Sequence, residues 1–263
     1  MLSAEKIKGY LSDRAGSVFI ETYGCVGSTN DIIKEHAKKG IHESLVIASK
    51  QTAGRGRRGR SFFSPDGTGL YMSLLLRPAK SPEISALLTT AAAVAVALAI
   101  EEVSSKKAEI KWINDVYIDG KKACGILCEA VIDATSGSPD HIIVGIGINL
   151  CDPVGGFPEE IRDVATSVFG NSLPDEDTVC MLAASITSYL ATFADKLEDR
   201  AFLDEYKKRL FVLGKEITVH TPRESFLAVA KDLDRDAHLI VTLKDGSKTV
   251  LSAGEISIRT VNN

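Results

Sequence analysis

An uncharged, alanine-rich run from Ala86 to Ile100 constrains the fold more than any other segment of the chain. Glu101 and Glu102 follow it directly. A membrane span needs about twenty apolar residues, so this shorter run predicts a helix buried in a protein core. A helix that is apolar on every side must be covered by other elements. The 263 residues of the chain are enough to build that cover.

Hydrophobic periodicity and turn residues predict a mixture of helices and strands. Helices are expected at residues 4–11, 31–39, 176–197 and 201–210, and strands at residues 17–22, 45–48, 70–76 and 141–150. The Asp119-Gly120 pair is typical of a tight turn and predicts a hairpin of residues 109–118 and 122–132. Strands interspersed with helices predict a main domain of α+β or mixed α/β type.

The character of the chain changes after Leu213-Gly214. Residues 216–261 contain about five short β runs separated by turns, with no helical period. We therefore expect two domains, residues 1–213 and residues 214–263, the second a small β-barrel hinged at Gly214. About fifty residues are few for an independent core, so the barrel is expected to lean on the larger domain.

Net charge and cysteine content exclude several classes of function. The formal net charge is −4, so the protein as a whole does not attract nucleic acid or anionic lipid. The five cysteines cannot all pair and do not complete a zinc-binding spacing, which is typical of reduced thiols in the cytoplasm. The N-terminal residues lack the apolar core of a signal peptide, so a cytoplasmic location is expected.

Positive charge is concentrated locally in the segment from Lys50 to Arg60, where Arg55, Arg57 and Arg58 also lie among glycines. Guanidinium groups bind carboxylate and phosphate with paired hydrogen bonds, and glycines let the backbone approach a ligand. Three interpretations are open from this segment alone. It is a loop that orders on a small phosphate or carboxylate ligand, a nucleic-acid patch, or a solvated basic loop.

Three other segments add to this pattern. Ser28-Thr29-Asn30 supplies oxygen atoms at a helix start, where they either cap the helix or bind a polar ligand. In residues 111–115 the only tryptophan lies beside an Asn-Asp pair, which either contacts a nucleotide or its Mg²⁺ or ends a strand. Gly145 and Gly147 interrupt an apolar strand, which indicates close approach of a ligand to the backbone. They lack the third glycine of a dinucleotide fingerprint, and the chain has no Walker A sequence.

Taken in order, these segments resemble the motif set of the biotin protein ligase family. The resemblance is carried by residues 27–30, 51–60, 111–115, 122–125 and 145–149. Their order and spacing are similar to the catalytic domain of that family, and the β-rich C-terminal part is similar to its SH3-like domain. The resemblance implies an α+β fold, in which a mixed β-sheet with helices forms a class II synthetase-like catalytic domain and a small SH3-like β-barrel follows it.

The resemblance also implies a two-step, ATP-dependent reaction. Biotin carboxylate would attack the α-phosphate of ATP, with Mg²⁺, to give biotinyl-5′-AMP and pyrophosphate. A lysine of a biotin carboxyl carrier protein domain, from acetyl-CoA carboxylase or a related carboxylase, would then form an amide and release AMP. Two anions meet in the first step, so cationic side chains are needed to reduce their repulsion. Each nucleophile comes from a substrate, so the cysteines are expected to be non-catalytic.

Site residues follow from the positions that match the family's motifs. Lys122, Arg57 and Arg55 are expected to be catalytic, with Lys122 against the biotin carboxylate and the phosphate and Arg57 retaining the adenylate. The expected biotin-binding residues are Ser28, Thr29, Asn30, Gln51, Gly54, Arg55, Gly56, Arg57, Lys122 and Gly125. The expected adenylate-binding residues are Arg57, Arg58, Trp112, Asn114, Asp115, Lys122 and Asn149, and Asp115 is also expected to help place Mg²⁺.

Two departures from the family pattern affect these expectations. Ile113 stands where the family usually has proline, which should loosen the local turn and tune activity rather than abolish it. About fifteen residues precede the first expected strand, whereas members that repress transcription carry a helix-turn-helix domain of roughly sixty residues there. We therefore expect a monofunctional ligase without sequence-specific DNA binding or membrane association. A homodimer is expected, with strand 142–148 or the arginine-loop side at its interface.

Three rival functions predict different features. A lipoate or octanoate ligase shares the fold, but it needs a different glycine-rich motif, with histidine, in place of the arginine segment. A nucleic-acid-binding module predicts a wide basic face with interleaved aromatics, whereas Phe62 and Phe63 are the only aromatics near the arginines. A catalytically weak biotin sensor stays open as an alternative, although every cationic position of the motif set is present.

Overall fold

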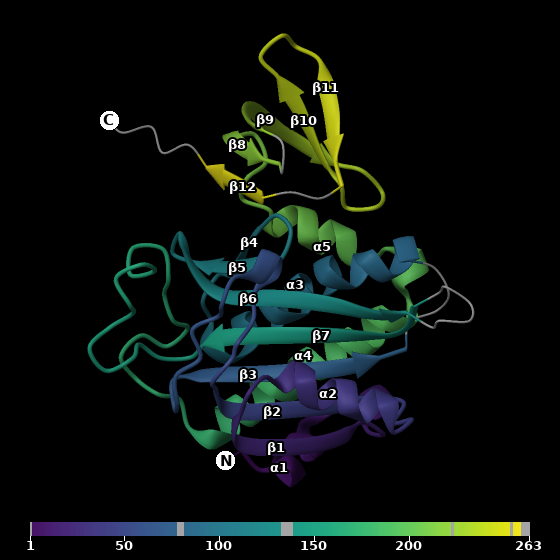
Figure 1. Cartoon of the computed structure of the whole chain (residues 1–263), viewed down its shortest axis with the longest axis vertical. Coiled ribbons are helices and arrows are strands. Elements are labelled where there is room, and N and C mark those ends of the chain that lie inside the picture. The colour runs from purple at the N-terminus through teal and green to yellow at the C-terminus, as the bar shows by residue number, and fades with distance from the viewer. Residues whose placement is uncertain (1, 78–81, 133–138, 222–223, 253–254, 259–263) are drawn as a thin grey trace.

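The structure is a computed structural model, which describes residues 2–77, 82–132, 139–221, 224–252 and 255–258. The larger of its two sheets is built from β1 (Phe19–Val26), β2 (Ser44–Gln51), β3 (Gly69–Leu76), β4 (Glu109–Lys111), β5 (Asp115–Ile118), β6 (Lys121–Ile132) and β7 (Pro139–Asn149). These strands lie in the order β1-β2-β3-β7-β6-β5-β4 (Figure 1). β1 and β2 are parallel and all other neighbours are antiparallel, so the expected mixed sheet is confirmed.

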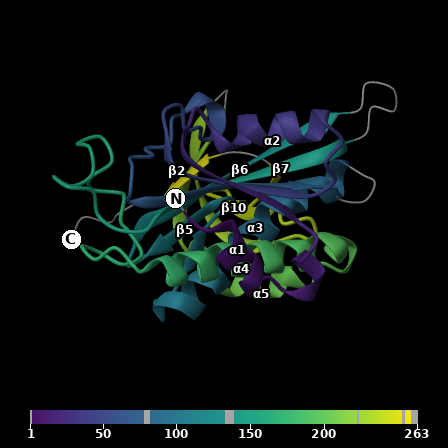
Figure 2. The ribbon, with the colours of Figure 1, turned by 90° about the horizontal axis from the view of Figure 1, so that it is seen from below.

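Helices cover both faces of this sheet. They are α1 (Ala4–Tyr10), α2 (Thr29–Lys38), α3 (Pro82–Ser104), α4 (Glu176–Asp195) and α5 (Phe202–Arg209), with short 3₁₀ helices η1 (Asp13–Ala15), η2 (Arg57–Gly59) and η3 (Leu197–Asp199). α2 joins β1 to β2, because parallel neighbours need a crossover connection. It packs on β2, β3 and β7, whereas α3 and α4 pack together on the opposite face (Figure 2).

α3 is the helix that the alanine-rich run predicts, and it lies at the centre of the main core. Residues Ala91 to Ala97 are fully buried, and the helix packs against α4 and the sheet. By length and composition, α3 and α4 are both apolar enough to cross a membrane. Here both helices cover the sheet instead, and the small alanine side chains permit close packing between them.

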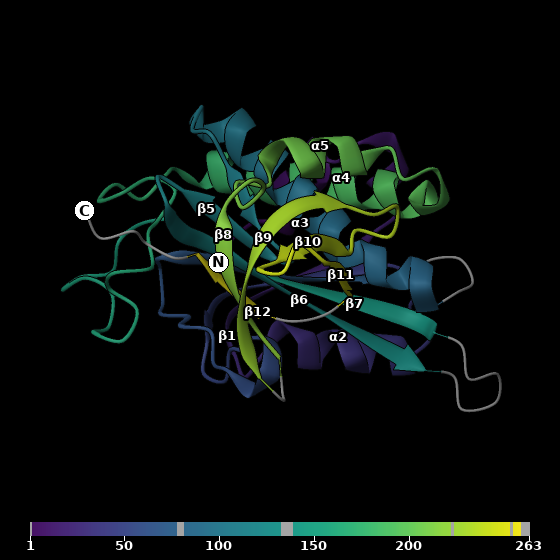
Figure 3. The same ribbon diagram turned by 90° about the horizontal axis from the view of Figure 1, so that it is seen from above.

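The second sheet follows α5 and shares its hydrophobic core with the larger domain. It is built from β8 (Glu216–His220), β9 (Ser225–Leu233), β10 (Leu239–Leu243), β11 (Lys248–Leu251) and β12 (Glu255–Ile258), in the order β11-β10-β9-β8-β12. Figures 1 and 3 show it beside α5, at the β4–β5 end of the larger sheet. Its buried residues, such as Ile217 and Val241, belong to the same hydrophobic core as the main sheet. The five expected β runs are therefore confirmed, and the expected boundary after residue 213 lies between α5 and β8.

The prediction that residues 109–118 form the first strand of a hairpin is wrong, because these residues form two strands. β4 ends at Lys111, β5 begins at Asp115, and the two strands pair antiparallel with these residues opposite each other. The predicted turn between β5 and β6 is confirmed. Asp119 and Gly120 both have positive φ, at 50° and 77°, as a tight hairpin turn requires.

Hydrogen bonds to distant residues explain the unexpected turn between β4 and β5. The Asn114 side-chain amide donates to the Ile126 carbonyl at 2.9 Å. The Trp112 indole donates to the Ala237 carbonyl, in the connection between β9 and β10, at 3.0 Å. Strand propensity describes how a residue fits a pleated surface, so it cannot anticipate partners that other parts of the chain bring to these side chains.

Other expected elements lie close to the observed ones. The strand expected at residues 17–22 is displaced, because β1 pairs with β2 along its whole length as far as Val26 and Gln51. The β region expected to end at residue 261 falls partly outside the described residues. β7 pairs with β3 on one edge and with β6 on the other, so residues 142–148 have no free strand edge for a dimer partner.

Replacing Ala93 by leucine should destabilise the protein, because the larger side chain cannot fit between the sheet and the helices without shifting them. We expect Ala93→Leu to lower the free energy of unfolding by about 1–3 kcal/mol, measured by urea denaturation followed by circular dichroism. Ala201→Leu, at an exposed position before α5, should change that free energy by less than about 0.5 kcal/mol. Equal stability of Ala93→Leu and the unchanged chain would contradict the packing described for α3.

Candidate active site

Two adjoining pockets lie between the central strands of the larger sheet and the arginine segment, residues 50–60. The inner pocket is lined by Ser28, Thr29, Asn30, Gln51, Arg55, Phe62, Gly125, Leu127, Gly145, Ile146 and Gly147. The outer pocket is lined by Gly56, Arg57, Arg58, Arg60, Ser61, Phe62, Lys111, Trp112, Asn114, Asp115, Lys122 and Ile256. Phe62 lines both pockets, so its side chain stands at the boundary between them.

The inner pocket lies on three glycines of neighbouring strands, with Gly125 of β6 paired opposite Gly147 of β7 and Gly145 two residues before it. A β-carbon at Gly145 would stand 2.4 Å from the Asn30 side-chain oxygen, and one at Gly147 would stand 2.4 Å from the Phe62 ring. Only glycine therefore lets these two side chains lie against the strands. The sequence indicates that a ligand approaches the backbone at these glycines. In this structure the side chains of Asn30 and Phe62 occupy that position.

Polar groups at the start of α2 form one end of the inner pocket. The backbone N–H and the hydroxyl of Thr29 donate to the Gln51 side-chain oxygen at 2.9 and 3.1 Å. The Ser73 hydroxyl lies 2.7 Å from the Thr29 hydroxyl and 2.5 Å from the Asn30 side-chain oxygen. Ser28 is the N-cap residue of α2, but its side chain makes no capping hydrogen bond. Capping by the Ser28 side chain is therefore not observed, and its ligand-binding role stays a prediction.

A carboxylate at the rim of the inner pocket joins several polar side chains. Glu129 accepts from the Asn30 amide at 2.6 Å and from Lys34 at 2.9 Å, and it lies 3.8 Å from Arg55. Arg55 also pairs with Asp31 at 2.6 Å. Burial alone would raise the pKa of Glu129, but hydrogen bonds from Lys34 and Asn30 lower the pKa below its ordinary value. The ionised carboxylate therefore holds Asn30 and Arg55 beside the pocket.

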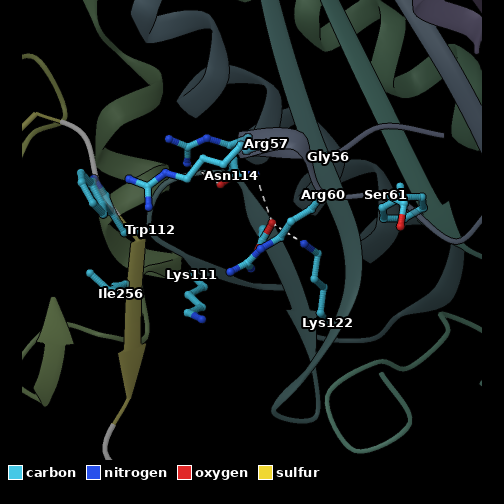
Figure 4. A pocket seen from close by; sticks show the side chains of 12 residues that line it. Gly56, Arg57, Arg60, Ser61, Lys111, Trp112, Asn114, Lys122 and Ile256 are labelled. Atoms are coloured by element: carbon cyan, nitrogen blue, oxygen red, sulfur yellow. Dashed lines mark hydrogen bonds and ion pairs between the residues drawn. The ribbon is translucent and has the colours of Figure 1, made fainter. Parts of the chain in front are cut away.

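The outer pocket is strongly cationic in a protein whose net charge is negative. Five of its lining residues are Lys or Arg, and Asp115 supplies the only carboxylate among them. Lys122 donates to that carboxylate at 2.7 Å, and Arg57 donates to the Asn114 side-chain oxygen at 2.9 Å (Figure 4). These partners hold both cations around one space, which suits an anion such as phosphate. The same arrangement can stabilise charge that develops at phosphorus during a reaction.

The arginine segment crosses the pockets as an ordered loop. Arg55 and Ser61 form an isolated antiparallel bridge, which closes the loop at its base. Arg58 and Gly59, near its tip, have φ values of 57° and 74°. Glycine adopts such values without strain, so the glycine-rich composition of the segment serves a tight chain reversal. This reversal places Arg57, Arg58 and Arg60 at the outer pocket.

Most of the residues that the sequence singles out line one of the two pockets. Asn149 and Gly54 do not line either of them. Asn149 ends β7 and donates to the Thr166 carbonyl at 2.9 Å, whereas a β-carbon at Gly54 would stand 2.5 Å from the Phe62 carbonyl. The lining residues that were not among the predicted site residues are Arg60, Ser61, Phe62, Lys111, Leu127, Gly145, Ile146, Gly147 and Ile256. The place of Phe62 just after the arginines was a usable signal, but nothing in the sequence near Ile256 connects it to the site.

Cysteines near the pockets are poor nucleophiles. Burial raises the pKa of the Cys124 thiol well above its ordinary value and raises that of Cys128 to about 11. The thiolate is the reactive form of cysteine, so these thiols are unreactive at neutral pH. Within the part of the chain that the structure describes, no group of three His, Cys, Asp or Glu side chains could hold a metal ion by itself.

Comparison with known proteins gives matches in both parts of the chain. Residues 23–149 match the biotin/lipoate A/B protein ligase family, and residues 212–259 match the biotin protein ligase C terminal domain. The chain is 31% identical over 258 residues to the bifunctional ligase/repressor BirA of Bacillus subtilis, which covers 96% of this chain and 78% of that protein. It is 28% identical to the biotin–[acetyl-CoA-carboxylase] ligase of Mycobacterium tuberculosis, over 88% of this chain and 85% of that protein.

Solved structures agree with the sequence matches. The biotin protein ligase from Aquifex aeolicus in complex with biotin and ATP superimposes with a TM-score of 0.73 and 28% identity, covering 92% of this chain and 98% of that one. The fold and the two adjoining pockets thus define a protein ligase of the biotin/lipoate class. Within that class, the chain belongs to the biotin protein ligase family.

The lowered pKa of Glu129 predicts a pH-dependent contribution to stability. A carboxyl whose pKa is depressed by folding stabilises the folded chain above its unfolded pKa, and this contribution is lost as the pH falls through the folded value. The unchanged chain should therefore have a higher free energy of unfolding than Glu129→Gln. This difference should be largest near about pH 6 and should decrease as the pH falls below the ordinary pKa of 4.5. Urea denaturation at several pH values measures it, with Glu160→Gln as an exposed control. An advantage that does not change with pH would contradict the ionised Glu129 contacts.

Proposed function

We propose that this biotin protein ligase activates biotin as biotinyl-5′-AMP and transfers it to a lysine of a biotin carboxyl carrier protein domain. The proposal is supported by the position of the two pockets, which adjoin at Phe62. A glycine-floored pocket with a polar end opens, at Phe62, into a pocket lined by five cationic side chains. This combination suits an acid with a ring that carries polar groups at one end and a carboxylate at the other, beside a nucleotide.

The inner pocket would hold the ring end of biotin. Ser28, Thr29 and Gln51 can hydrogen-bond its ureido group, and the glycine row can support the flat side of the rings. The free space in this pocket is about 20 Å³, which is enough for one water molecule and too small for a bicyclic ring. Because the Phe62 ring lies directly on Gly147, we infer that Phe62 moves away from the glycine row when biotin binds.

The first step is adenylation in the outer pocket. A carboxylate oxygen of biotin bonds to the α-phosphorus of ATP, and the bond from that phosphorus to the pyrophosphate oxygen breaks. Both reactants are anionic, so the positive charge of Lys122 and Arg57 reduces their repulsion and stabilises the developing charge. Lys122 has three N–H donors, so it can bind phosphate while Asp115 still holds it.

Asp115 would also place a Mg²⁺ ion that enters with ATP. Magnesium is usually held by one or two carboxylates together with substrate phosphates. The outer pocket provides one carboxylate, which lies 3.2 Å from the Asn114 amide that orients it. This donor set fits an ion shared with the nucleotide, and such an ion neutralises part of the phosphate charge.

The second step needs no nucleophile from this chain. The neutral ε-amine of the carrier lysine attacks the carbonyl carbon of the mixed anhydride, an amide bond forms, and AMP leaves. The competing nucleophile is water, which the loop of residues 54–60 would exclude by closing over the adenylate. Arg57 has the retaining role in this proposal, since it reaches from that loop to Asn114 on the opposite wall.

The finer architecture belongs to the same proposal. We assign the larger domain to the class II synthetase-like type and the C-terminal sheet to the SH3-like type, because the first has a mixed sheet and the second a five-stranded antiparallel one. A homodimer would use the arginine-loop side, since β7 is paired on both edges. A cytoplasmic location and the absence of sequence-specific DNA binding stay predictions.

Mass spectrometry of a carrier domain tests the proposed reaction. The purified protein is incubated with a biotin carboxyl carrier domain, Mg-ATP and biotin, and parallel reactions contain lipoate or octanoate in place of biotin. We expect an ATP-dependent mass gain of one biotinyl group on the carrier. A gain only on a lipoyl domain with lipoate or octanoate would assign the protein to that activity instead, and tight biotin binding without any transfer would indicate a sensor.

Replacement of Lys122 and of Arg57 should damage the reaction in different ways. Lys122→Ala removes charge next to the reacting phosphate and should slow adenylate formation by at least about a hundredfold, measured by pyrophosphate release. Arg57→Gly should still form adenylate but lose it to solution, measured as free biotinyl-5′-AMP. Lys121→Ala, at the exposed neighbouring position, is the matched control and should leave both measurements unchanged. Rapid pyrophosphate release by Lys122→Ala would contradict the assignment of Lys122.

A further inference from the structure

The turn from Trp112 to Asp115 connects the two catalytic cations of the outer pocket. Asn114 accepts a hydrogen bond from Arg57, and Asp115 accepts one from Lys122. Both cations therefore depend on the position of a turn of a few residues between β4 and β5. Long cationic side chains adopt many rotamers, so their positions in the pocket are set by the groups that hold their ends.

A buried tyrosine holds this turn from behind. The Tyr206 hydroxyl, from α5, donates to the Ile113 carbonyl at 3.1 Å. Tyr206 is fully buried and does not line either pocket. Burial raises the pKa of this hydroxyl well above its ordinary value, and the nearby Asp115 charge acts in the same direction. The group therefore stays protonated and remains a hydrogen-bond donor across the physiological pH range.

The connection between β9 and β10 holds the same turn from another side. The Trp112 indole N–H donates to the Ala237 carbonyl at 3.0 Å, and Trp112 is only 4% exposed. Figure 4 shows Trp112 at the wall of the outer pocket, near Ile256 of β12. The turn is thus anchored to α5 through Ile113 and to the β9–β10 connection through Trp112. In the family pattern a proline at residue 113 stiffens the backbone of this turn. Here residue 113 is isoleucine, and these two hydrogen bonds hold the turn.

We propose that Tyr206 is a positioning residue for adenylate formation, because its hydroxyl fixes the Ile113 carbonyl and so the Asn114 and Asp115 side chains that hold Arg57 and Lys122. The inference rests on the proposed biotin ligase function. Removing the hydroxyl leaves a buried carbonyl without its partner, and the turn must shift to regain one. A displacement of about 1 Å in a catalytic group can cost up to about a hundredfold in rate.

Tyr206→Phe in the full chain tests this role, because it removes one oxygen atom and keeps the buried ring. We expect a fall of about tenfold or more in the rate of pyrophosphate release, with a raised KM for ATP. Biotin affinity should change by less than about twofold, since no residue of the turn lines the inner pocket. The emission of Trp112, the chain's only tryptophan, should also shift, which reports movement of the turn directly.

Tyr189→Phe is the matched control, because this hydroxyl bonds Glu102 on the surface, away from both pockets. It should leave the rate, the KM for ATP and the Trp112 emission unchanged. A double-mutant cycle with Asn114→Ala provides a second measurement. If Tyr206 acts through Asn114, the loss in the double variant should be smaller than the product of the two single losses.

Several outcomes would overturn the inference. One is a Tyr206→Phe variant that keeps the rate and the KM for ATP of the unchanged chain. Another is a Tyr206→Phe variant whose unfolding midpoint is lower but whose kinetics are normal when folded. The third is a double-mutant cycle in which the losses from Tyr206→Phe and Asn114→Ala are independent. These results differ from a failure of the proposed function. In that case the unchanged chain itself would release no pyrophosphate with biotin and ATP, and the comparison of variants would not arise.

Discussion

The close approach of side chains to the backbone at three glycines is the constraint on which the rest of the site depends. Gly125, Gly145 and Gly147 lie at the centre of the larger sheet, where any β-carbon at the last two would collide with Asn30 or Phe62. Because those two side chains can lie on the strands, α2 and the arginine loop can approach the same face. The two pockets exist only because both elements meet there.

Electrostatics then divides the two pockets into different chemical environments. The chain carries more acidic than basic residues, yet five cationic side chains line the outer pocket with one carboxylate. Such a concentration is tolerable because polar partners hold individual cations in place, as Asn114 holds Arg57. An ion pair with partial exposure stabilises a protein by at most about 1 kcal/mol, so the fold does not depend on these pairs. The inner pocket, by contrast, has glycines and neutral polar side chains along most of its lining, with Arg55 as its one cation.

Local signals made much of this predictable from the sequence, and long-range contacts account for the rest. The alanine-rich run, the Asp119-Gly120 turn and the arginine segment act through their own composition, so α3, the β5–β6 turn and the cationic loop were predicted. The break in the strand at residues 112–114 was not, because it depends on bonds to Ile126 and Ala237. For the same reason Ile256 was missed, and Asn149 lies against Thr166 instead of lining a pocket.

The contribution of Ile256 to the outer pocket affects how the enzyme is made in the cell. Ile256 follows Lys122 by 134 positions and lies on β12, which pairs with β8 in the second sheet. At about 5–20 residues per second, a ribosome adds Ile256 about 7–27 s after Lys122. The central strands and the arginine loop can fold during that interval, but the outer pocket gains its last wall only when β12 has paired. Biosynthesis thus delays a complete outer pocket until the second sheet has assembled.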